Sequence, residues 1–274
     1  MNNAKDYYDI HSVEYKNKWD LSEVGLERPA NYYRLKIINS MLGMASIKAH
    51  DKVVEIGCGT GLVLKELLKV TRPIYGTDIS IEMLERVRDS LIKDRKVSIV
   101  EDFKPTLDNN QSDAFLMRND LLELNLPKNY FDKIISMEVL RYIDDVPLAL
   151  QNIKNIMKKD TIFVFTVTNF FSFSLFPIKY YFRKLFNRIN KKEELLQFFV
   201  TEGSIKKDIK NADLRVVAFK KLNMLSFNPL VQGTVSTSDK AKKIVRLDAI
   251  LSKIPLINCF FDTFIFAVKL DDAV

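Results

Sequence analysis

The sequence has 274 residues, of which 47% are apolar and 28% are charged, a globular composition with enough apolar material for a sizeable core. One elaborated domain is expected rather than two. Two cysteines exclude a disulfide framework and a Cys-rich metal site, and they favour a cytoplasmic location. The first twenty residues lack the apolar core of a signal peptide.

The net charge of +7 is concentrated in one region. Residues 179–221 contain 12 Lys or Arg and 5 Asp or Glu, so the rest of the chain is neutral overall. A local basic surface favours an acidic partner, such as a phosphorylated substrate, a lipid headgroup or nucleic acid, although a solvated face has the same composition. Residues 161–178 carry no charge and could just span a bilayer. Their scattered Thr, Ser and Asn favour a buried strand that runs into an aromatic loop.

In chain order, residues 1–50 are predicted to form a mostly helical N-terminal cap, and strands then alternate with helices. The predicted strands are 52–56, 73–77, 114–118, 131–137, 161–167, 214–225 and 261–270. The predicted helices are 62–70, 81–94, 145–158 and 204–213. This alternation predicts an α/β fold, an open, mostly parallel seven-stranded sheet with helices on both faces, over residues 51–274. Residues 170–200 and 226–258 interrupt it and are predicted insertions after strands five and six, on the substrate side.

A glycine-rich loop follows the first predicted strand in "KVVEIGCGTG", with Gly57, Gly59 and Gly61 at alternate positions. Ligands of open parallel sheets bind outside the carboxyl ends of the strands, and glycines there let the backbone approach a ligand closely. No Lys follows Gly61, which disfavours a phosphate-binding P-loop. Leu62 breaks the G-x-G-x-x-G pattern of dinucleotide-binding loops.

An acid, Asp78, ends the second predicted strand, 17 residues after Gly61. A carboxylate at this place can accept both hydrogen bonds of a ribose diol. No basic residue stands beside it to accommodate a 2′-phosphate.

Residues 53–61 (VVEIGCGTG) and 75–80 (YGTDIS) together resemble the class I S-adenosylmethionine-dependent methyltransferases. Residues 118–145 extend the resemblance, with an acid after strand three and the Phe-Asp that opens strand four. It covers residues 50–168 well and 204–270 loosely. It implies an antiparallel last strand, S-adenosylmethionine as cofactor and methyl transfer as the reaction.

The resemblance also implies a set of cofactor-binding residues. Glu55 matches the acid before the glycines, which bind the methionine part, and Cys58 is a small residue beside the cofactor. Asp78 matches the ribose acid, while Ile79 and Met83 are expected on the adenine. The complete expected set is Tyr15, Arg34, Glu55, Gly57, Cys58, Gly59, Gly61, Asp78, Ile79, Met83, Asp120, Leu121 and Met137.

Two acids are alternatives for reading the adenine amino group, Asp102 and Asp120. We favour Asp120, with Leu121 as a backbone contact, which leaves residues 94–112 as an insertion. In the N-terminal cap, Arg34 resembles an arginine that pairs with the cofactor carboxylate, and Tyr15 resembles an aromatic residue of the cofactor pocket. Each has a plainer alternative as an ordinary surface residue.

The implied reaction needs no protein nucleophile or metal, because a sulfonium methyl is already electrophilic and positioning supplies much of the acceleration. A general base is needed only for an acceptor that holds its proton tightly. The candidates for catalysis are His11, Glu138 and Tyr142; His50 precedes the first strand, away from the crevice. Many relatives carry histidine where this chain has Arg141 and Tyr142, so no histidine is expected to be essential.

The aromatic insertion favours a small-molecule or lipid-like acceptor, methylated on oxygen or nitrogen. The N/D-P-P-Y tetrapeptide of many DNA and amide methyltransferases is missing, which disfavours nucleic acid. An RNA methyltransferase and a catalytically inactive cofactor-binding partner protein are the alternatives.

Residues 174–192 are predicted to contain a helix with Pro177 in its first turn. Its apolar residues fall on one face and are Ile178, Phe182, Leu185, Phe186 and Ile189. This face is interpreted as a lid over the substrate pocket. Contact with an anionic membrane surface and plain packing on the core are the alternatives.

Overall fold

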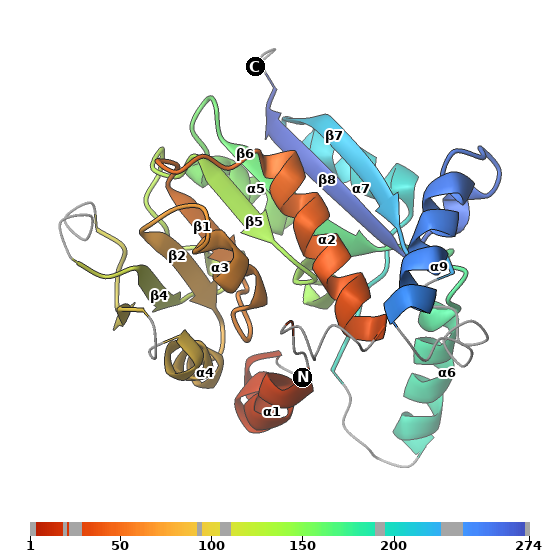
Figure 1. Cartoon of the computed structure of the whole chain (residues 1–274), viewed down its shortest axis with the longest axis horizontal. Helices are drawn as coiled ribbons and strands as arrows, with labels where there is room; N and C mark the ends of the chain where they lie inside the picture. Colours follow the sequence, from red (N-terminus) through yellow and green to blue (C-terminus); the bar gives the residue numbers. More distant parts are fainter. Residues whose placement is uncertain are drawn as a thin grey trace.

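The computed structural model is an open eight-stranded sheet with helices on both faces (Figure 1). It describes residues 4–18, 21, 29–91, 95–104, 111–189, 195–225 and 238–271. The strands are β1 (Val53–Ile56), β2 (Ile74–Asp78), β3 (Val97–Val100), β4 (Ala114–Arg118), β5 (Lys133–Ser136), β6 (Ile162–Thr168), β7 (Leu214–Leu222) and β8 (Thr263–Leu270). The α-helices are α1 (Ala4–Lys18), α2 (Pro29–Ala45), α3 (Leu62–Leu67), α4 (Ile81–Leu91), α5 (Val146–Ile156), α6 (Phe176–Ile189), α7 (Glu202–Asn211) and α9 (Ser238–Leu251). Short 3₁₀ helices are η3 (Leu121–Glu123), η4 (Leu140–Tyr142) and η5 (Asn258–Phe260).

The strand order is β3-β4-β2-β1-β5-β6-β8-β7. Every neighbouring pair is parallel except those that involve β8, which runs antiparallel to both β6 and β7. The predicted fold, including its antiparallel last strand, is confirmed. The predicted count of seven strands is wrong because β3 adds an eighth inside the supposed insertion 94–112. This strand is four residues long, half-buried and paired with β4 alone, so it carries no clear alternating pattern.

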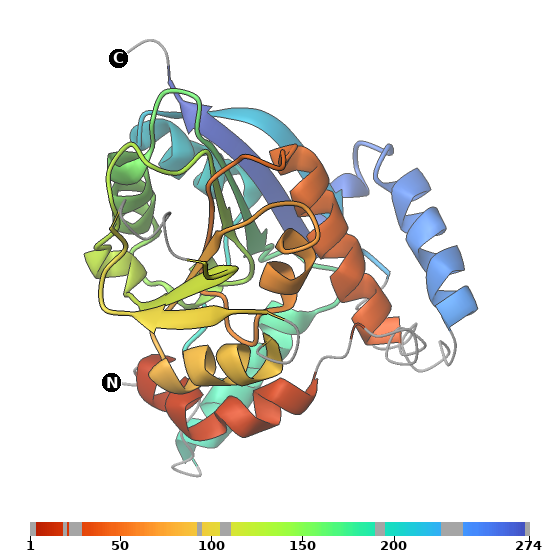
Figure 2. The same ribbon diagram turned by 60° about the vertical axis from the view of Figure 1, so that its left-hand side comes forward.

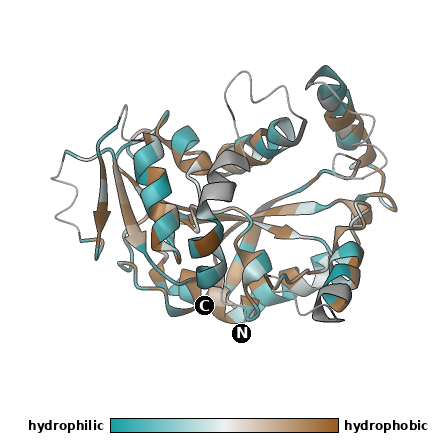
Figure 3. Ribbon diagram, turned by 90° about the horizontal axis from the view of Figure 1, so that it is seen from below, coloured by the Kyte–Doolittle hydropathy of each residue, from teal (hydrophilic) through white to brown (hydrophobic). Residues whose placement is uncertain are grey.

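Two apolar layers sandwich the sheet because successive strand residues face opposite sides. Val53 joins the layer beneath α2, α3 and α4, while Val54 joins the layer beneath α5 and α7. Figure 2 shows α2 and α5 on opposite sides of the strands. Figure 3 shows largely hydrophobic strands between helices that have mixed surfaces.

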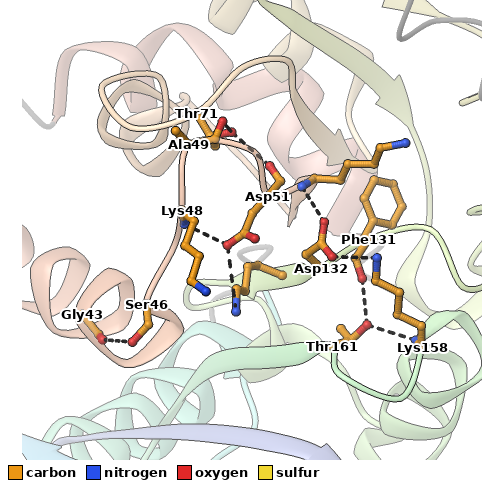
Figure 4. Close-up of polar contacts among 12 residues, drawn as sticks. Gly43, Ser46, Lys48, Ala49, Asp51, Thr71, Phe131, Asp132, Lys158 and Thr161 are labelled. Carbon is orange, nitrogen blue, oxygen red and sulfur yellow. Dashed lines mark hydrogen bonds and ion pairs between the residues drawn. The ribbon is translucent and has the colours of Figure 1, made fainter.

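A polar network fixes the amino ends of the central strands, on the edge away from the glycine loop (Figure 4). The hydroxyl of Thr71 donates to the carbonyls of Ala49 and Asp51 at 2.9 and 3.0 Å. Asp132 accepts from the Lys52 amide at 2.8 Å and pairs with the Lys158 ammonium at 2.6 Å. These contacts join the turns that precede β1, β2, β5 and β6, so the opposite edge is left to the glycine loop.

The N-terminal helices take two different positions. In both views α1 lies beside α4, and the Ser80 hydroxyl hydrogen-bonds the Asp9 carboxylate between them (Figures 1 and 2). Helix α2 instead packs on the sheet, with Ile37, Ile38 and Met41 in the core. A domain division at residue 50 stays a prediction. The insertions contain α6 and α9, and residues 190–194 and 226–237 lie outside the described part of the chain. In that described part, no helix has both the length and the apolar character to cross a bilayer.

Candidate active site

One cavity of about 700 Å³ lies at the carboxyl edge of the sheet. One end, here named the glycine half, is lined by residues that end or follow β1, β2 and β4. The other end, named the basic half, is lined by residues after β5, by Arg34 of α2, and by residues of α6 and of the segments next to it. Lining residues of the basic half include Arg34, Glu138, Val139, Arg141, Tyr142, Phe176, Lys179, Arg183, Gln197 and Asp262.

The loop after β1 contains three glycines with left-handed backbone conformations, Gly57, Gly59 and Gly61. Gly57 has φ 70°, and a Cβ built there would overlap Cγ2 of Val139. Gly59 has φ 50°, and its amide donates to Oδ2 of Asp78 at 2.8 Å. Lack of space and backbone strain therefore both exclude a side chain at Gly57, whereas an added Cβ at Gly59 meets nothing within 4 Å and only the backbone conformation favours glycine there. Gly61 follows as the N-cap of α3.

Asp78 ends β2 beside this loop and is buried. Its Oδ1 accepts the Ser80 amide at 3.0 Å, and its Oδ2 accepts the Gly59 amide. Burial raises the pKa of Asp78 from 3.8 to about 6, although the backbone amides of Ser80 and Gly59 oppose the shift. Each oxygen keeps a further lone pair, so the carboxylate can still accept hydrogen bonds from a ligand.

Glu55 and Cys58 are buried on either side of the loop entrance and both line the cavity. Burial, with help from the Asp78 charge, raises the pKa of the Glu55 carboxyl well above its usual range. Its Oε2 is buried without a hydrogen-bond partner among the described residues. Burial likewise raises the pKa of the Cys58 thiol. A thiol kept protonated is a poor nucleophile, in line with the predicted role of a small residue in the loop.

The expected adenine side of the glycine half contains Ile79, Met83, Asp120 and Leu121, all of which line the cavity. Asp120 caps η3 by accepting the Leu122 amide at 2.9 Å. Asp102, the alternative acid, is not among the lining residues and accepts instead from Nδ2 of Asn125 at 3.3 Å. The structure therefore brings Asp120, and not Asp102, to the cavity.

Arg34 reaches the cavity from α2 but bonds a protein carboxylate. Its Nη2 lies 3.0 Å from Oε2 of Glu138, and Nη1 of Arg141 lies 3.7 Å from the same oxygen. Glu138 has φ 60°, and its amide donates to Oγ1 of Thr166 at 2.7 Å. Met137 precedes it on the cavity wall. Glu138 is thus held in an unusual backbone conformation between two guanidinium groups.

Among the described side chains of α1, the aromatic ones that line the cavity are Tyr7 and Tyr8. Tyr8 packs edge-on against Tyr142, with ring centroids 5.7 Å apart. His11 packs against Tyr7 at 4.4 Å and is not among the lining residues. Tyr15 lies in α1, but its side chain falls outside the described structure.

Helix α6 corrects the prediction of an apolar lid face. Ile178, Phe182 and Leu185 are 48%, 71% and 59% exposed and do not line the cavity. The face toward the cavity carries Lys179 and Arg183 instead. The orientation follows from Pro177 and Tyr180, which are buried on the inner side and set the rotation of the helix. The side chains of Phe186 and Ile189 lie outside the described structure.

Comparison with known proteins identifies the fold and the family. A model of the methyltransferase domain family matches residues 28–218, well over half of the chain. The chain belongs to this family. The match confirms the resemblance to class I S-adenosylmethionine-dependent methyltransferases and identifies the chain as a methyltransferase.

Individual relatives are distant from this methyltransferase. An uncharacterized protein of Methanocaldococcus jannaschii, MJ1252, is 27% identical over 79% of this chain and 74% of its own length. A candidate methyltransferase in complex with the Trm112 activator of Haloferax volcanii superposes with a TM-score of 0.65, at 15% identity, over 98% of both chains. Magnesium protoporphyrin IX methyltransferase of Synechocystis PCC 6803 with bound SAH superposes with a TM-score of 0.59, at 13% identity, over 97% of this chain and 98% of its own. These two solved structures share the fold.

Several lining residues of the methyltransferase cavity carried no sequence signal. Gln197 lies between α6 and α7, and Asp262 directly precedes β8; neither belongs to a motif. Asn119 is next to the predicted Asp120 and could have been included with it. Tyr7 and Tyr8 belong to the N-terminal cap, and the packing of α1 beside α4 directs them to the cavity.

Proposed function

We propose that this methyltransferase transfers the methyl group of S-adenosylmethionine to a small-molecule or lipid-like acceptor bound in the basic half of the cavity. The observation that carries the proposal is one continuous cavity that joins Asp78 and the glycine loop to Phe176 and α6. Methyl transfer requires donor and acceptor to meet in line inside one enclosure. The aromatic lining of the basic half, with Tyr8, Tyr142 and Phe176, supports an acceptor with an apolar part.

The residues of the glycine half fit the cofactor. Gly57 and Gly59 line the cavity without side chains, so the loop backbone can approach a ligand closely. Asp78 has lone pairs for a ribose diol, and Oε2 of Glu55 is a buried acceptor that a ligand donor would satisfy. Ile79 and Met83 supply apolar surface for an adenine, and Asp120 supplies a carboxylate for its amino group.

The cofactor supplies a methyl group made electrophilic by a sulfonium. The residues of the basic half then have to orient the acceptor and exclude water, and orientation alone is worth about 7–11 kcal/mol at best. Glu138 shares its charge with Arg34 and Arg141, so we assign it a positioning role rather than that of a base. Tyr142 lies on the cavity wall and contributes an aromatic face to the acceptor.

The proposal is tested by incubating the protein and a cell extract with methyl-labelled S-adenosylmethionine and fractionating the products. We expect label in the small-molecule or lipid fraction, and its loss with Asp78→Ala. Asp89→Ala is the matched control, because Asp89 is exposed on α4 and does not line the cavity. Label in RNA would favour the alternative acceptor. Cofactor binding without any transfer would favour the inactive partner protein.

Peripheral contact with an anionic membrane surface is a further part of the proposal. It is supported by the exposed apolar side chains of α6 next to the exposed Lys184. A lipid-like acceptor would then reach the cavity beside the helix that touches the membrane. The cytoplasmic location expected from the cysteine content stays a prediction.

A further inference from the structure

The basic half of the cavity carries more positive than negative charge. The ionisable Arg, Lys, Asp and Glu side chains that line it are Arg34, Arg141, Lys179, Arg183, Glu138 and Asp262. Four of these are cations and two are carboxyls, a formal excess of two positive charges. The excess is larger when Asp262 holds a proton, and burial raises the pKa of Asp262, although the hydroxyls of Ser172 and Ser174 oppose the shift.

Arg141 is the inner cation of this half. Its Nη2 donates to Oε1 of Gln197 at 2.5 Å, and its Cζ lies 5.0 Å from the ring centre of Phe176 and 5.5 Å from that of Tyr142. Its Nε is buried and has no hydrogen-bond partner among the described residues. A buried donor left unsatisfied costs about 1–3 kcal/mol, more on a charged group. An anionic oxygen of a ligand in the cavity would supply the missing acceptor.

Lys179 and Arg183 are the outer cations, one helical turn apart on α6, and both line the cavity. Within the described part of the chain, no hydrogen bond or ion pair reaches the Lys179 ammonium. Like charges four residues apart on a helix repel each other, and an anion between them removes the penalty.

A shared contact ties the inner and outer cations together. The backbone amide of Gln197 donates to the hydroxyl of Tyr180 at 2.9 Å, and the side-chain oxygen of Gln197 accepts from Arg141. Tyr180 is buried on the inner side of α6, between Lys179 and Arg183 in sequence. The rotation that buries Tyr180 therefore also presents the two outer cations to the cavity.

We propose that the basic half binds an acceptor that carries a carboxylate or a phosphate on an apolar body, with Arg141 as the inner anchor and Lys179 and Arg183 at the mouth. Val139, Phe176 and Tyr142 provide the apolar surface beside these cations. The inference rests on the proposed function, because it assigns the basic half to the methyl acceptor. It narrows a small-molecule or lipid-like acceptor to an amphipathic acid.

The test is a calorimetric titration of the S-adenosylhomocysteine-saturated protein with octanoate, octyl phosphate and octylammonium. We expect the two anions to bind and octylammonium to bind at least about tenfold more weakly, a difference of about 1.4 kcal/mol. Tighter binding of octanoate identifies a carboxylate acceptor, and tighter binding of octyl phosphate identifies a phosphate. Octylammonium binding as tightly as both anions, or no heat with either anion, would overturn the inference.

Two single-charge variants of α6 form a matched pair. Lys179 and Lys184 are both exposed on this helix, but only Lys179 lines the cavity. Lys179→Met should raise the Kd of the anions about tenfold, while Lys184→Met should change it less than about twofold. Equal Kd values in the two variants would contradict the inference. Binding of S-adenosylhomocysteine without binding of either anion would contradict this inference and leave the proposed function intact. Failure to bind S-adenosylhomocysteine would contradict the proposed function itself.

Discussion

Arg34 and Glu138 form an ion pair between α2 and the turn after β5, with Nη2 of Arg34 3.0 Å from Oε2 of Glu138. The side chains are 14% and 23% exposed, so solvent screens the pair only in part. Arg141 shares the same carboxylate at 3.7 Å. One carboxylate thus pairs with two cations on the wall of the basic half.

A double-mutant cycle measures this arrangement. Glu138→Gln should lower the free energy of unfolding more than Arg34→Met, because it removes the negative charge that Arg34 and Arg141 share. We expect a coupling of about 1 kcal/mol between the two substitutions in urea unfolding. Additive effects would show that the pair contributes nothing to stability.

The same variants decide whether Arg34 also binds the cofactor. If Arg34 acts through Glu138 alone, the Kd for S-adenosylhomocysteine should be the same in Glu138→Gln and in the double variant. A further loss of affinity in the double variant would instead support a direct contact between Arg34 and the cofactor carboxylate, as the family resemblance implies.

Asp78 should make cofactor affinity depend on pH. Its pKa of about 6 in the folded protein lies above the ordinary 3.8, so its contribution to stability is largest below pH 3.8 and is lost as the pH rises through about 6. Ligand hydroxyls stabilise the ionised carboxylate, so binding releases a proton at low pH. The Kd for S-adenosylhomocysteine should therefore rise by up to about tenfold for each pH unit below about 6 and level off above it.

Calorimetry from about pH 5 to about pH 7.5 checks this expectation. Asp78→Asn should bind more weakly and lose most of the pH dependence. A wild-type Kd that stays constant across the range would show that Asp78 does not receive the ligand's hydrogen bonds.

Gly57→Ala should destabilise the protein and abolish cofactor binding. The added Cβ would overlap Val139, and φ 70° costs an L-residue about 1–2 kcal/mol by itself. Gly43→Ala is the matched control, because Gly43 lies inside α2 with nothing within 4 Å of an added Cβ. It should gain about 0.5–1 kcal/mol of stability. Thermal unfolding and calorimetry of both variants test the pair, and full binding by Gly57→Ala would refute the assigned role of the loop.

Phe182→Asp should leave the Kd for S-adenosylhomocysteine unchanged and reduce sedimentation with anionic liposomes. Phe182 is 71% exposed and does not line the cavity. Ile250→Asp is the control, since Ile250 is 61% exposed on α9, a different helix. An equal loss of sedimentation in both variants would contradict the assignment of the membrane contact to α6. If the protein sedimented equally with neutral and anionic liposomes, charge attraction would not contribute to membrane binding.

His11→Gln combined with His50→Gln should keep the rate of labelled methyl transfer within about tenfold of wild type, or about 1.4 kcal/mol. His11 packs on Tyr7 and His50 is exposed in the turn before β1. Neither lines the cavity. A loss of three orders of magnitude would identify His11 as a base that moves into the site.

The sequence by itself determined the fold class, the family and the place of the glycine loop and Asp78 at the carboxyl edge of the sheet. Strand and helix periodicity is a local property, and so is the turn chemistry of Gly57 and Gly59. Asp78 follows from the same logic, because the end of a parallel strand next to the glycine loop faces the ligand crevice.

The tertiary structure decided the features that depend on which distant segments meet. The half-buried edge strand β3 had too weak a pattern to be found, and the approach of Asp120 rather than Asp102 depends on which strand lies beside β2. Arg34 forms an ion pair with Glu138, which is 104 residues away and cannot be predicted from helix spacing. The rotation of α6 was set by the burial of Pro177 and Tyr180, so the cavity received Lys179 and Arg183 while Phe182 faces outward. Long-range packing chose among orientations that local periodicity leaves equivalent.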